Sequence, residues 1–321
     1  MTTPSYLDIY LGPLATHLSR GSVTDLYVNR PGELWLESLG GHLERHELPE
    51  LDNALLTRLA RQVASLTHQA INREHPLLAA TLPDGTRAQF VAPPATRGPL
   101  AMALRRHVNA DLTLADYEAA DAFAPVGCAS DQVDAELERL RRERRYAQFF
   151  VAAVRARKTI LVSGGTSTGK TTFLNALLRE ISTEERLLVV EDTPELKLTQ
   201  PNIVGLVAVR SALGETAVTT EDLLTAALRM RPDRIILGEL RGREAFTFLR
   251  AASTGHPGSM TTIHANSPDN ALEQLALLVL TSGQNLGRRE IIDYARTTVD
   301  YVVQLERREG RRQVVAIEPM R

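Results

Sequence analysis

Residues Leu161 to Leu174 read LVSGGTSTGKTTFL and carry the first chemistry that the sequence offers. Within them Gly164, Gly169, Lys170 and Thr171 satisfy the spacing G-x-x-x-x-G-K-[ST], after a run typical of a strand and before one typical of a helix. Backbone N–H groups of such a loop point at phosphate oxygens, and the N-terminus of the helix adds a favourable dipole. The pattern therefore predicts a triphosphate site.

The positions of this loop have different expected roles. Lys170 would bridge the β- and γ-phosphates, and the Thr171 hydroxyl would hold Mg²⁺, so the expected cofactors are ATP and Mg²⁺. A chance glycine-rich turn is the alternative, but the flanking strand and helix weigh against it. The loop residues expected to contact the nucleotide are Gly164, Gly165, Thr166, Ser167, Thr168, Gly169, Lys170, Thr171 and Thr172.

A second chemical signal is Glu239, which ends the apolar run RIILGE. A P-loop sheet presents an acid at the end of another apolar strand to hold the magnesium shell. Glutamate is one methylene longer than aspartate, so Glu239 can reach a water beside the γ-phosphate as general base, or hold a magnesium-bound water. It could instead cap the following helix. Arg241 is placed to sense the γ-phosphate or to form a structural ion pair.

Two more predicted strands end in polar side chains: LLVVED ends in Glu191 and Asp192, and MTTIHAN contains His264. Taken alone, such a carboxylate is often a solvated loop residue and such a histidine a buried hydrogen-bonding residue. Together with Lys170 and Glu239 they form the layout of an ATP hydrolysis site, because parallel strands end at one edge. We therefore expect these four groups, the lysine, Glu191, Glu239 and His264, to be catalytic.

The elements that must position these residues follow a repeating pattern. From residue 158 onward, near-continuous apolar strands alternate with helices, which indicates a largely parallel sheet covered on both faces. The end of the chain predicts two strands joined by RREGRR. Strands are expected at 159–163, 186–191, 234–239 and 259–264, helices at 174–181, 223–229 and 244–252, and the two final strands within 300–317.

The first part of the chain predicts a smaller α+β domain. TDLYVNRPGELWLE alternates apolar residues around a turn, which is a hairpin signal, and a helix at 51–68 precedes strands within 77–104. The charged run DAELERLRRERR is interpreted as a solvated helix, because its acids and arginines have helical ion-pair spacing. We expect an N-terminal domain at 1–125, a linker at 126–150 that acts as a hinge, and an ATPase domain at 151–321.

Composition limits the classes of protein. The 321 residues suffice for two domains, and the net charge of -2 weighs against a protein that coats nucleic acid. Cys128 is the single cysteine, so an internal disulfide and a cysteine zinc cluster are excluded and a reducing compartment is expected. The beginning of the chain lacks a signal-peptide pattern, and no apolar run approaches the roughly 18 residues that span a bilayer. Any membrane contact should be peripheral.

Four segments in this order and spacing resemble the traffic ATPases of secretion systems: GGTSTGKTT, VVEDTPEL, RMRPDRIILGELRGREAF and ASTGHPGSMTTIHANSP. The similarity is greatest to the hexameric ATPases of type IV secretion and conjugation machines, and is strongest over residues 154–305. LPDGTRAQFVAPPATRGPLAMALRRH is similar to their N-terminal domain. The resemblance implies a RecA-like P-loop NTPase domain preceded by a smaller α+β domain.

The resemblance also assigns residues. Glu191 belongs to the acidic box, Glu239 to the atypical Walker B strand and His264 to the histidine box. The chain lacks the four-cysteine insert and the long N-terminal extension of many type II and pilus-extension ATPases. Gly242 stands where retraction motors usually carry an aspartate. These departures favour the type IV branch.

An arginine of the N-terminal domain should contact the nucleotide phosphates in this family. Arg105 is the best match, and Arg106 and Arg87 are alternatives. The guanidinium suits this role because its fork contacts two phosphate oxygens and stays charged. A purely structural role for Arg105 is the other interpretation.

The implied function is an ATP-hydrolysing motor of a type IV secretion system. A hexameric ring would use ATP-driven domain motion to power substrate export or machine assembly, together with other channel ATPases and inner-membrane components. The expected location is peripheral, on the cytoplasmic face of the inner membrane, and no sequence-specific nucleic-acid binding is expected. Two alternatives remain at this point: a DNA-translocating ATPase of conjugation, and a nucleotide-gated assembly scaffold.

Overall fold

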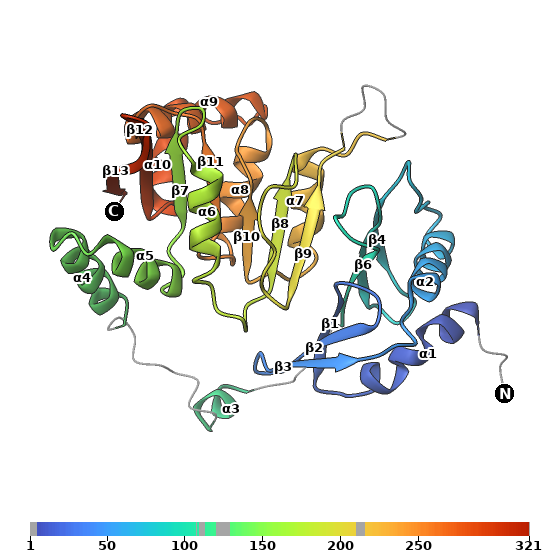
Figure 1. The fold of residues 1–321 in the computed structure, drawn as a ribbon. Coiled ribbons are helices and arrows are strands. Elements are labelled where there is room, and N and C mark those ends of the chain that lie inside the picture. The colour runs from blue at the N-terminus through green and yellow to red at the C-terminus, as the bar shows by residue number, and fades with distance from the viewer. Residues whose placement is uncertain (1–4, 107, 109–112, 120–128, 210–215, 321) are drawn as a thin grey trace.

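The structure, a computed structural model, describes residues 5–106, 108, 113–119, 129–209 and 216–320. These residues form two sheets with helices packed against them (Figure 1). Cys128 and residues 126–128 of the predicted linker lie outside the described residues. Among the described residues, no helix is long and apolar enough to cross a membrane.

The N-terminal sheet has six antiparallel strands in the order β3-β2-β1-β6-β5-β4. The predicted hairpin is confirmed, because β1 pairs with β2. One face is covered by helices α1 (Tyr6–Leu18) and α2 (Asn53–Leu66), whose leucines pack on the strands. The strands are β1 (Val23–Val28), β2 (Glu33–Ser38), β3 (Leu43–Glu47), β4 (Leu77–Thr81), β5 (Arg87–Val91) and β6 (Ala101–Arg105).

The C-terminal sheet has seven strands in the order β13-β12-β7-β11-β10-β8-β9. All neighbours are parallel except β12 and β13, so the largely parallel sheet is confirmed, as is the α/β fold class. The strands are β7 (Ile160–Gly164), β8 (Leu187–Glu191), β9 (Ile203–Val207), β10 (Arg234–Leu237), β11 (Met260–Ile263), β12 (Tyr301–Arg308) and β13 (Arg311–Pro319).

Helices cover both faces of this sheet because its strands are apolar on both sides. In β7, Leu161 faces one core whereas Ile160 and Val162 face the other. One face carries α4 (Ala129–Arg142), α5 (Tyr146–Arg155) and α6 (Lys170–Leu178). The other carries α7 (Thr220–Leu228), α8 (Glu244–Ser253), α9 (Pro268–Thr281) and α10 (Arg288–Thr298).

Much of the predicted linker packs into the core between the C-terminal sheet and helix α6. Leu137 and Leu140 of α4, and Phe149 and Phe150 of α5, are buried with residues of β7 and α6. The short helix α3 (Leu114–Ala119) carries no buried residue and lies between the two sheets along the chain. The segment that enters the C-terminal half therefore packs as helices on its sheet (Figure 1).

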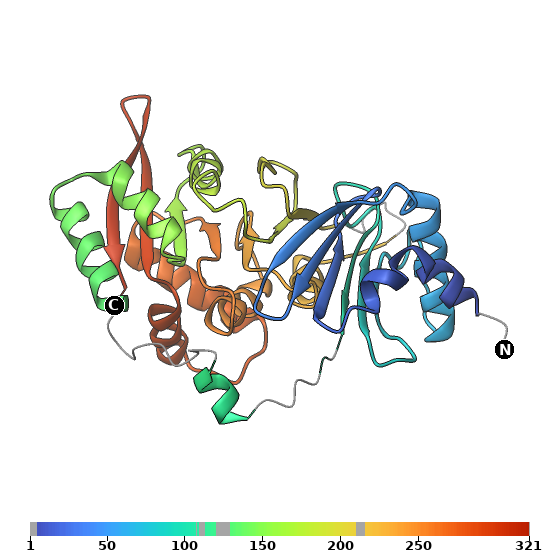
Figure 2. The same ribbon diagram turned by 90° about the horizontal axis from the view of Figure 1, so that it is seen from below.

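The uncovered face of the N-terminal sheet packs against the C-terminal half. Arg186, which is fully buried, lies 4.0 Å over the Tyr27 ring and donates to Asn29 Oδ1 at 2.7 Å. Thr96 pairs antiparallel with Leu206, so residues 95–97 extend the C-terminal sheet beyond β9. The β12–β13 hairpin lies at the opposite end of the molecule (Figure 2). Through the pairing of Thr96 with Leu206, the N-terminal half joins the C-terminal sheet at the edge formed by β9.

Candidate nucleotide-binding site

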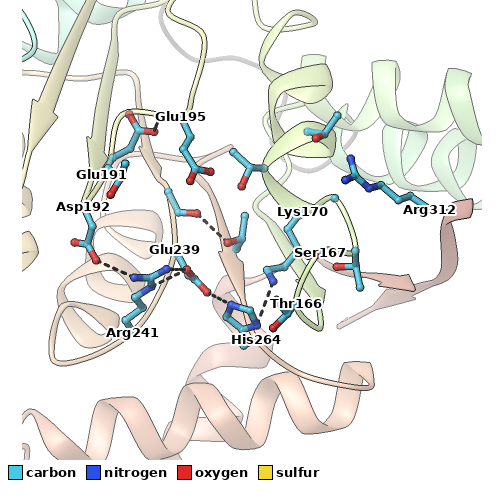
Figure 3. A pocket seen from close by; sticks show the side chains of 17 residues that line it. Thr166, Ser167, Lys170, Glu191, Asp192, Glu195, Glu239, Arg241, His264 and Arg312 are labelled. Carbon is cyan, nitrogen blue, oxygen red and sulfur yellow. Dashed lines mark hydrogen bonds and ion pairs between the residues drawn. The ribbon is translucent and has the colours of Figure 1, made fainter. Parts of the chain in front are cut away.

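A cavity of about 370 Å³ lies at the carboxyl edge of the C-terminal sheet (Figure 3). It brings together four side chains from separate elements: Lys170, Glu191, Glu239 and His264. Of the loop residues expected to contact the nucleotide, all of 166–172 line the cavity. The full lining is Thr166, Ser167, Thr168, Gly169, Lys170, Thr171, Thr172, Glu191, Asp192, Thr193, Glu195, Gly238, Glu239, Arg241, Thr262, His264 and Arg312.

The loop between β7 and α6 depends on its glycines. A Cβ on Gly164 would lie 2.5 Å from Thr168 Oγ1, which itself donates to the Gly165 carbonyl at 2.9 Å. Gly169 has φ +94°, a conformation that side chains with a Cβ rarely adopt. Gly164 and Gly165 do not line the cavity, and their carbonyls accept from Lys170 Nζ. The loop is a compact cradle that ends in the N-terminus of α6.

Lys170 begins a polar chain that crosses the cavity. Its Nζ donates to Gly164 O at 2.8 Å and lies 3.3 Å from His264 Nδ1. His264 Nε2 lies 2.7 Å from Glu239 Oε1. Because an ammonium group only donates, Nδ1 accepts and Nε2 carries the proton that faces the carboxylate. Burial lowers the pKa of Lys170. Lysine, histidine and glutamate are thus linked across the ends of three elements.

Arg241 holds the other side of Glu239. Its Nε donates to Glu239 Oε2 at 2.6 Å, and its Nη1 lies 3.5 Å from Asp192 Oδ2. The hydrogen bond to Glu239 raises the pKa of Arg241. Arg241 therefore forms the ion pair considered as its alternative role while still lining the cavity. Glu244, and not Glu239, accepts the backbone N–H groups of Arg241 and Gly242 before α8, at 2.6 and 2.7 Å.

Glu191 is held differently from Glu239. Its side chain is 2% exposed, and its Oε1 accepts the backbone N–H groups of Glu195 and Leu196 at 2.9 and 2.8 Å. Its Oε2 forms an ion pair with Arg97, whose Nη1 donates to Leu196 O at 2.7 Å. Burial lowers the pKa of Arg97. Both oxygens of Glu191 are therefore engaged, and its partner comes from the N-terminal half.

The three arginines proposed from the sequence lie elsewhere. Arg105 Nε is 3.9 Å from Asp25 Oδ1, and Arg105 lines a second cavity together with Arg87. Arg106 donates to the backbone carbonyl of Arg20 at 2.9 Å. Within the described residues, none of the three lines the phosphate-loop cavity. Arg97 of the N-terminal half does reach the wall of this cavity, through its ion pair with the lining residue Glu191.

Sequence reasoning missed Arg97 and Arg312. Arg97 stands in PPATRG, inside the segment matched to the N-terminal domain, and the Pro-Pro turn before it is the available signal that this segment leaves the N-terminal sheet. Arg312 stands in the RREGRR turn, where four arginines gave no reason to prefer one. The positions of both side chains depend on how elements far apart in the sequence pack together.

The cavity suits a magnesium ion bound with a nucleotide. Thr171 supplies a hydroxyl at the start of α6, and Glu239 supplies a carboxylate across the cavity. Mg²⁺ commonly keeps several waters and takes few protein ligands beside substrate phosphates. No cluster of three or more histidine, cysteine or acidic side chains within the described ranges is arranged to hold a metal. The donor set therefore fits an ion held largely by phosphate and water oxygens.

The P-loop, the parallel sheet and the converging strand-end residues define a RecA-like P-loop NTPase with an added α+β domain. A family model described as "Type II/IV secretion system protein" matches residues 128–308, and the chain belongs to this family. The predicted secretion-ATPase family is thereby confirmed.

Relatives match nearly the whole chain. The chain is 35% identical to the type IV secretion system protein VirB11 of Bartonella henselae, over 96% of this chain and 91% of the relative. It is 40% identical to the type IV secretion system protein PtlH of Bordetella pertussis, over 97% and 94%. The solved VirB11 ATPase of the Brucella suis type IV secretion system, in complex with sulphate, has a TM-score of 0.91 at 35% identity and 98% coverage of both chains.

Proposed function

We propose that this protein is an ATP-hydrolysing motor of a type IV secretion system. The observation that carries the proposal is the polar chain from Lys170 through His264 to Glu239 in the P-loop cavity. It lies in a chain similar over almost its whole length to VirB11 and PtlH proteins. The similarity favours a secretion motor over a DNA translocase or an assembly scaffold.

ATP binding uses the loop and Lys170. The backbone N–H groups of residues 166–172 surround the phosphates, and Lys170 Nζ exchanges the carbonyls of Gly164 and Gly165 for β- and γ-phosphate oxygens. Thr171 and Glu239 are placed to hold Mg²⁺, directly or through water. Such an ion neutralises the charge that develops on the phosphates.

Glu239 and Glu191 have different roles in hydrolysis. Glu239 faces the cavity, so it is the group placed to accept a proton from the attacking water. His264 orients that carboxylate and, with its protonated Nε2, is placed to stabilise the transferred phosphoryl group. The Glu191 side chain is 2% exposed, against 16% for Glu239, and it is held by two backbone N–H groups and Arg97, so we assign it a positioning role.

The Arg97–Glu191 ion pair supports a coupling between the site and the N-terminal half. We divide the chain into domains at 1–125 and 151–321, joined by residues 126–150, of which α4 and the start of α5 pack on the C-terminal sheet. ATP and ADP must differ in affinity for two arrangements of these domains if hydrolysis is to drive motion. The motor acts as a hexameric ring with other channel components, peripherally on the cytoplasmic face of the inner membrane. In this arrangement Arg105 makes its contacts outside the phosphate-loop cavity.

Steady-state ATPase measurements with and without single-stranded DNA test this function. The wild-type chain should hydrolyse ATP without DNA, and the Glu239→Gln variant should not. Strong stimulation by DNA would favour the translocase, and turnover no higher than that of the variant would favour the scaffold. Mass determination with and without ATP and Mg²⁺ tests the ring, for which a mass of six subunits is expected.

A further inference from the structure

Arg312 reaches the phosphate loop from the side away from the hydrolytic residues (Figure 3). The sheet order explains this position. Strands β11, β10 and β8, which end near His264, Glu239 and Glu191, lie on one side of β7, whereas β12 and β13 lie on the other. The β12–β13 hairpin therefore carries Arg312 to the opposite flank of Lys170. The cavity has a cationic side chain from each flank of its P-loop strand.

The Arg312 side chain crosses directly over the loop. A Cβ built on Gly169 would lie 2.8 Å from Arg312 Cδ and 3.6 Å from its Nε. The hairpin fixes this approach, because Arg312 pairs in register with Arg307 of β12. The space that a side chain at Gly169 would need is thus filled by the aliphatic stem of Arg312. Its guanidinium continues past the residue that precedes Lys170.

The guanidinium is available to a ligand. No ion pair or hydrogen bond joins it to another described residue, in contrast to Arg241, which is paired with Glu239, and Arg308, which is paired with Glu306. Arginine binds phosphate oxygens through two parallel N–H donors, and it also stacks on planar rings. A charged fork without a carboxylate partner at a phosphate cavity is suited to the nucleotide itself.

We infer that Arg312 binds the α-phosphate and ribose end of the nucleotide, an inference that rests on the proposed nucleotide site. Lys170, His264 and Glu239 mark the end of the cavity where the γ-phosphate lies. The triphosphate must run from there across the start of α6, so its α-phosphate leaves on the flank that the hairpin covers. Arg312 therefore contacts a part that ATP and ADP share.

Because Arg312 contacts a part that ATP and ADP share, its loss should change KM and kcat differently. An interaction that is equal in the ground state and the transition state changes KM and leaves kcat unaltered. Loss of the Arg312 charge should weaken ATP and ADP binding by the same factor, roughly 10-fold for a charge-assisted contact. Inorganic pyrophosphate, which lacks the α-phosphate ester and ribose, should bind as before.

Calorimetric titration of ADP and pyrophosphate, with steady-state ATPase kinetics, tests the inference in the full chain. Arg312→Met keeps the stem over Gly169 but removes the charge, and thermal denaturation would check that it folds like the wild type. Arg311→Met removes a neighbouring exposed charge of the same hairpin and serves as the control. We expect weaker ADP binding and a higher KM in Arg312→Met alone, with kcat and pyrophosphate affinity unchanged.

Three results would overturn the assignment. ADP affinity equal in Arg312→Met and Arg311→Met would make Arg312 a packing residue. An equal loss of pyrophosphate affinity would move it to the β- and γ-phosphates, and a fall in kcat at constant KM would place it in the hydrolytic step. Failure of the proposed function would look different, because the wild type would then bind ADP no better than Lys170→Ala.

Discussion

Arg97 and Glu191 form a buried ion pair that joins a loop of the N-terminal half to the end of strand β8 in the wall of the phosphate cavity. The same arginine donates to the Leu196 carbonyl, and the same glutamate accepts the backbone N–H groups of Glu195 and Leu196 in the loop after β8. One interaction thus shapes the loop after β8 and fixes the N-terminal half beside it. Loss of this ion pair should therefore alter both the loop after β8 and the packing of the N-terminal half beside it.

The first prediction concerns this pair. Arg97→Met should lower the free energy of unfolding by about 3 kcal/mol, because a buried carboxylate loses its counter-charge. Arg142→Met, which breaks an exposed pair with Glu138, should change it by about 0.5 kcal/mol or less. Chemical denaturation measures both. If the double variant Arg97→Met with Glu191→Gln is no more stable than Arg97→Met, the stranded charge is not the cause.

The second prediction separates the two acids. Glu239→Gln should retain ATP binding and lose roughly 100-fold in kcat, as expected when a general base is removed. Glu191→Gln should keep far more of its turnover and lose stability, because its carboxylate is engaged by Arg97 and backbone N–H groups. Single-turnover hydrolysis and ATP titration distinguish them. Equal losses of kcat would return Glu191 to a catalytic role.

The third prediction concerns Lys170. Lys170→Ala should weaken ATP affinity roughly 100-fold, because charge-assisted contacts to two phosphates are lost. Gln200→Ala, a change outside the cavity, controls for general damage to the ATPase fold. Fluorescence titration with a labelled nucleotide measures the affinities. Unchanged affinity in the lysine variant would remove the phosphate-bridging role.

The fourth prediction concerns His264. His264→Ala should lower kcat, but less than Glu239→Gln does, because the histidine acts through its polar contact with Glu239 and the glutamate takes the proton. His264→Gln, which keeps an N–H donor, should recover part of the loss. Steady-state kinetics at saturating ATP checks the order. The reverse order would transfer the main role to the histidine.

The fifth prediction is a pH effect at Asp25. Burial and the nearby Glu37 raise the pKa of this carboxyl above its ordinary value of 3.8, so the native state disfavours its charge. Between the two pKa values the folded chain binds more protons than the unfolded chain, so this group lowers stability as the pH rises through that window. Asp25→Asn should therefore stabilise the protein at neutral pH and lose that advantage near pH 3.8 and below. Denaturation at pH 7 and near pH 4 tests this, and an equal gain at both values would contradict it.

The residues that could be predicted are those governed by a topological rule. Lys170, Glu239 and His264 lie far apart in the sequence, yet parallel strands end at a common edge, so their convergence follows from recognising the strands. Arg97 follows no such rule. It reaches Glu191 because residues 95–97 pair with β9, a strand that the patterns did not predict.

The same difference explains why other features of the structure could not be predicted from the sequence. Helices α1, α9 and α10 and strands β3 and β9 were not predicted, although all of them except β3 bury apolar residues like the elements that were. The position of Arg312 depends on the hairpin register, which brings its side chain over Gly169. Side chains that act between two segments far apart in the sequence are positioned by packing, which short-range periodicity does not encode.

The pairing of Thr96 with Leu206 has a consequence for anyone who divides the protein. An unpaired edge strand is a template for association with another chain. Preparations of the ATPase half alone would present β9 uncovered and should self-associate more readily than the intact chain. A fragment that begins upstream of Pro93, or a charged substitution at the freed edge, would be the sounder choice for isolating the enzyme.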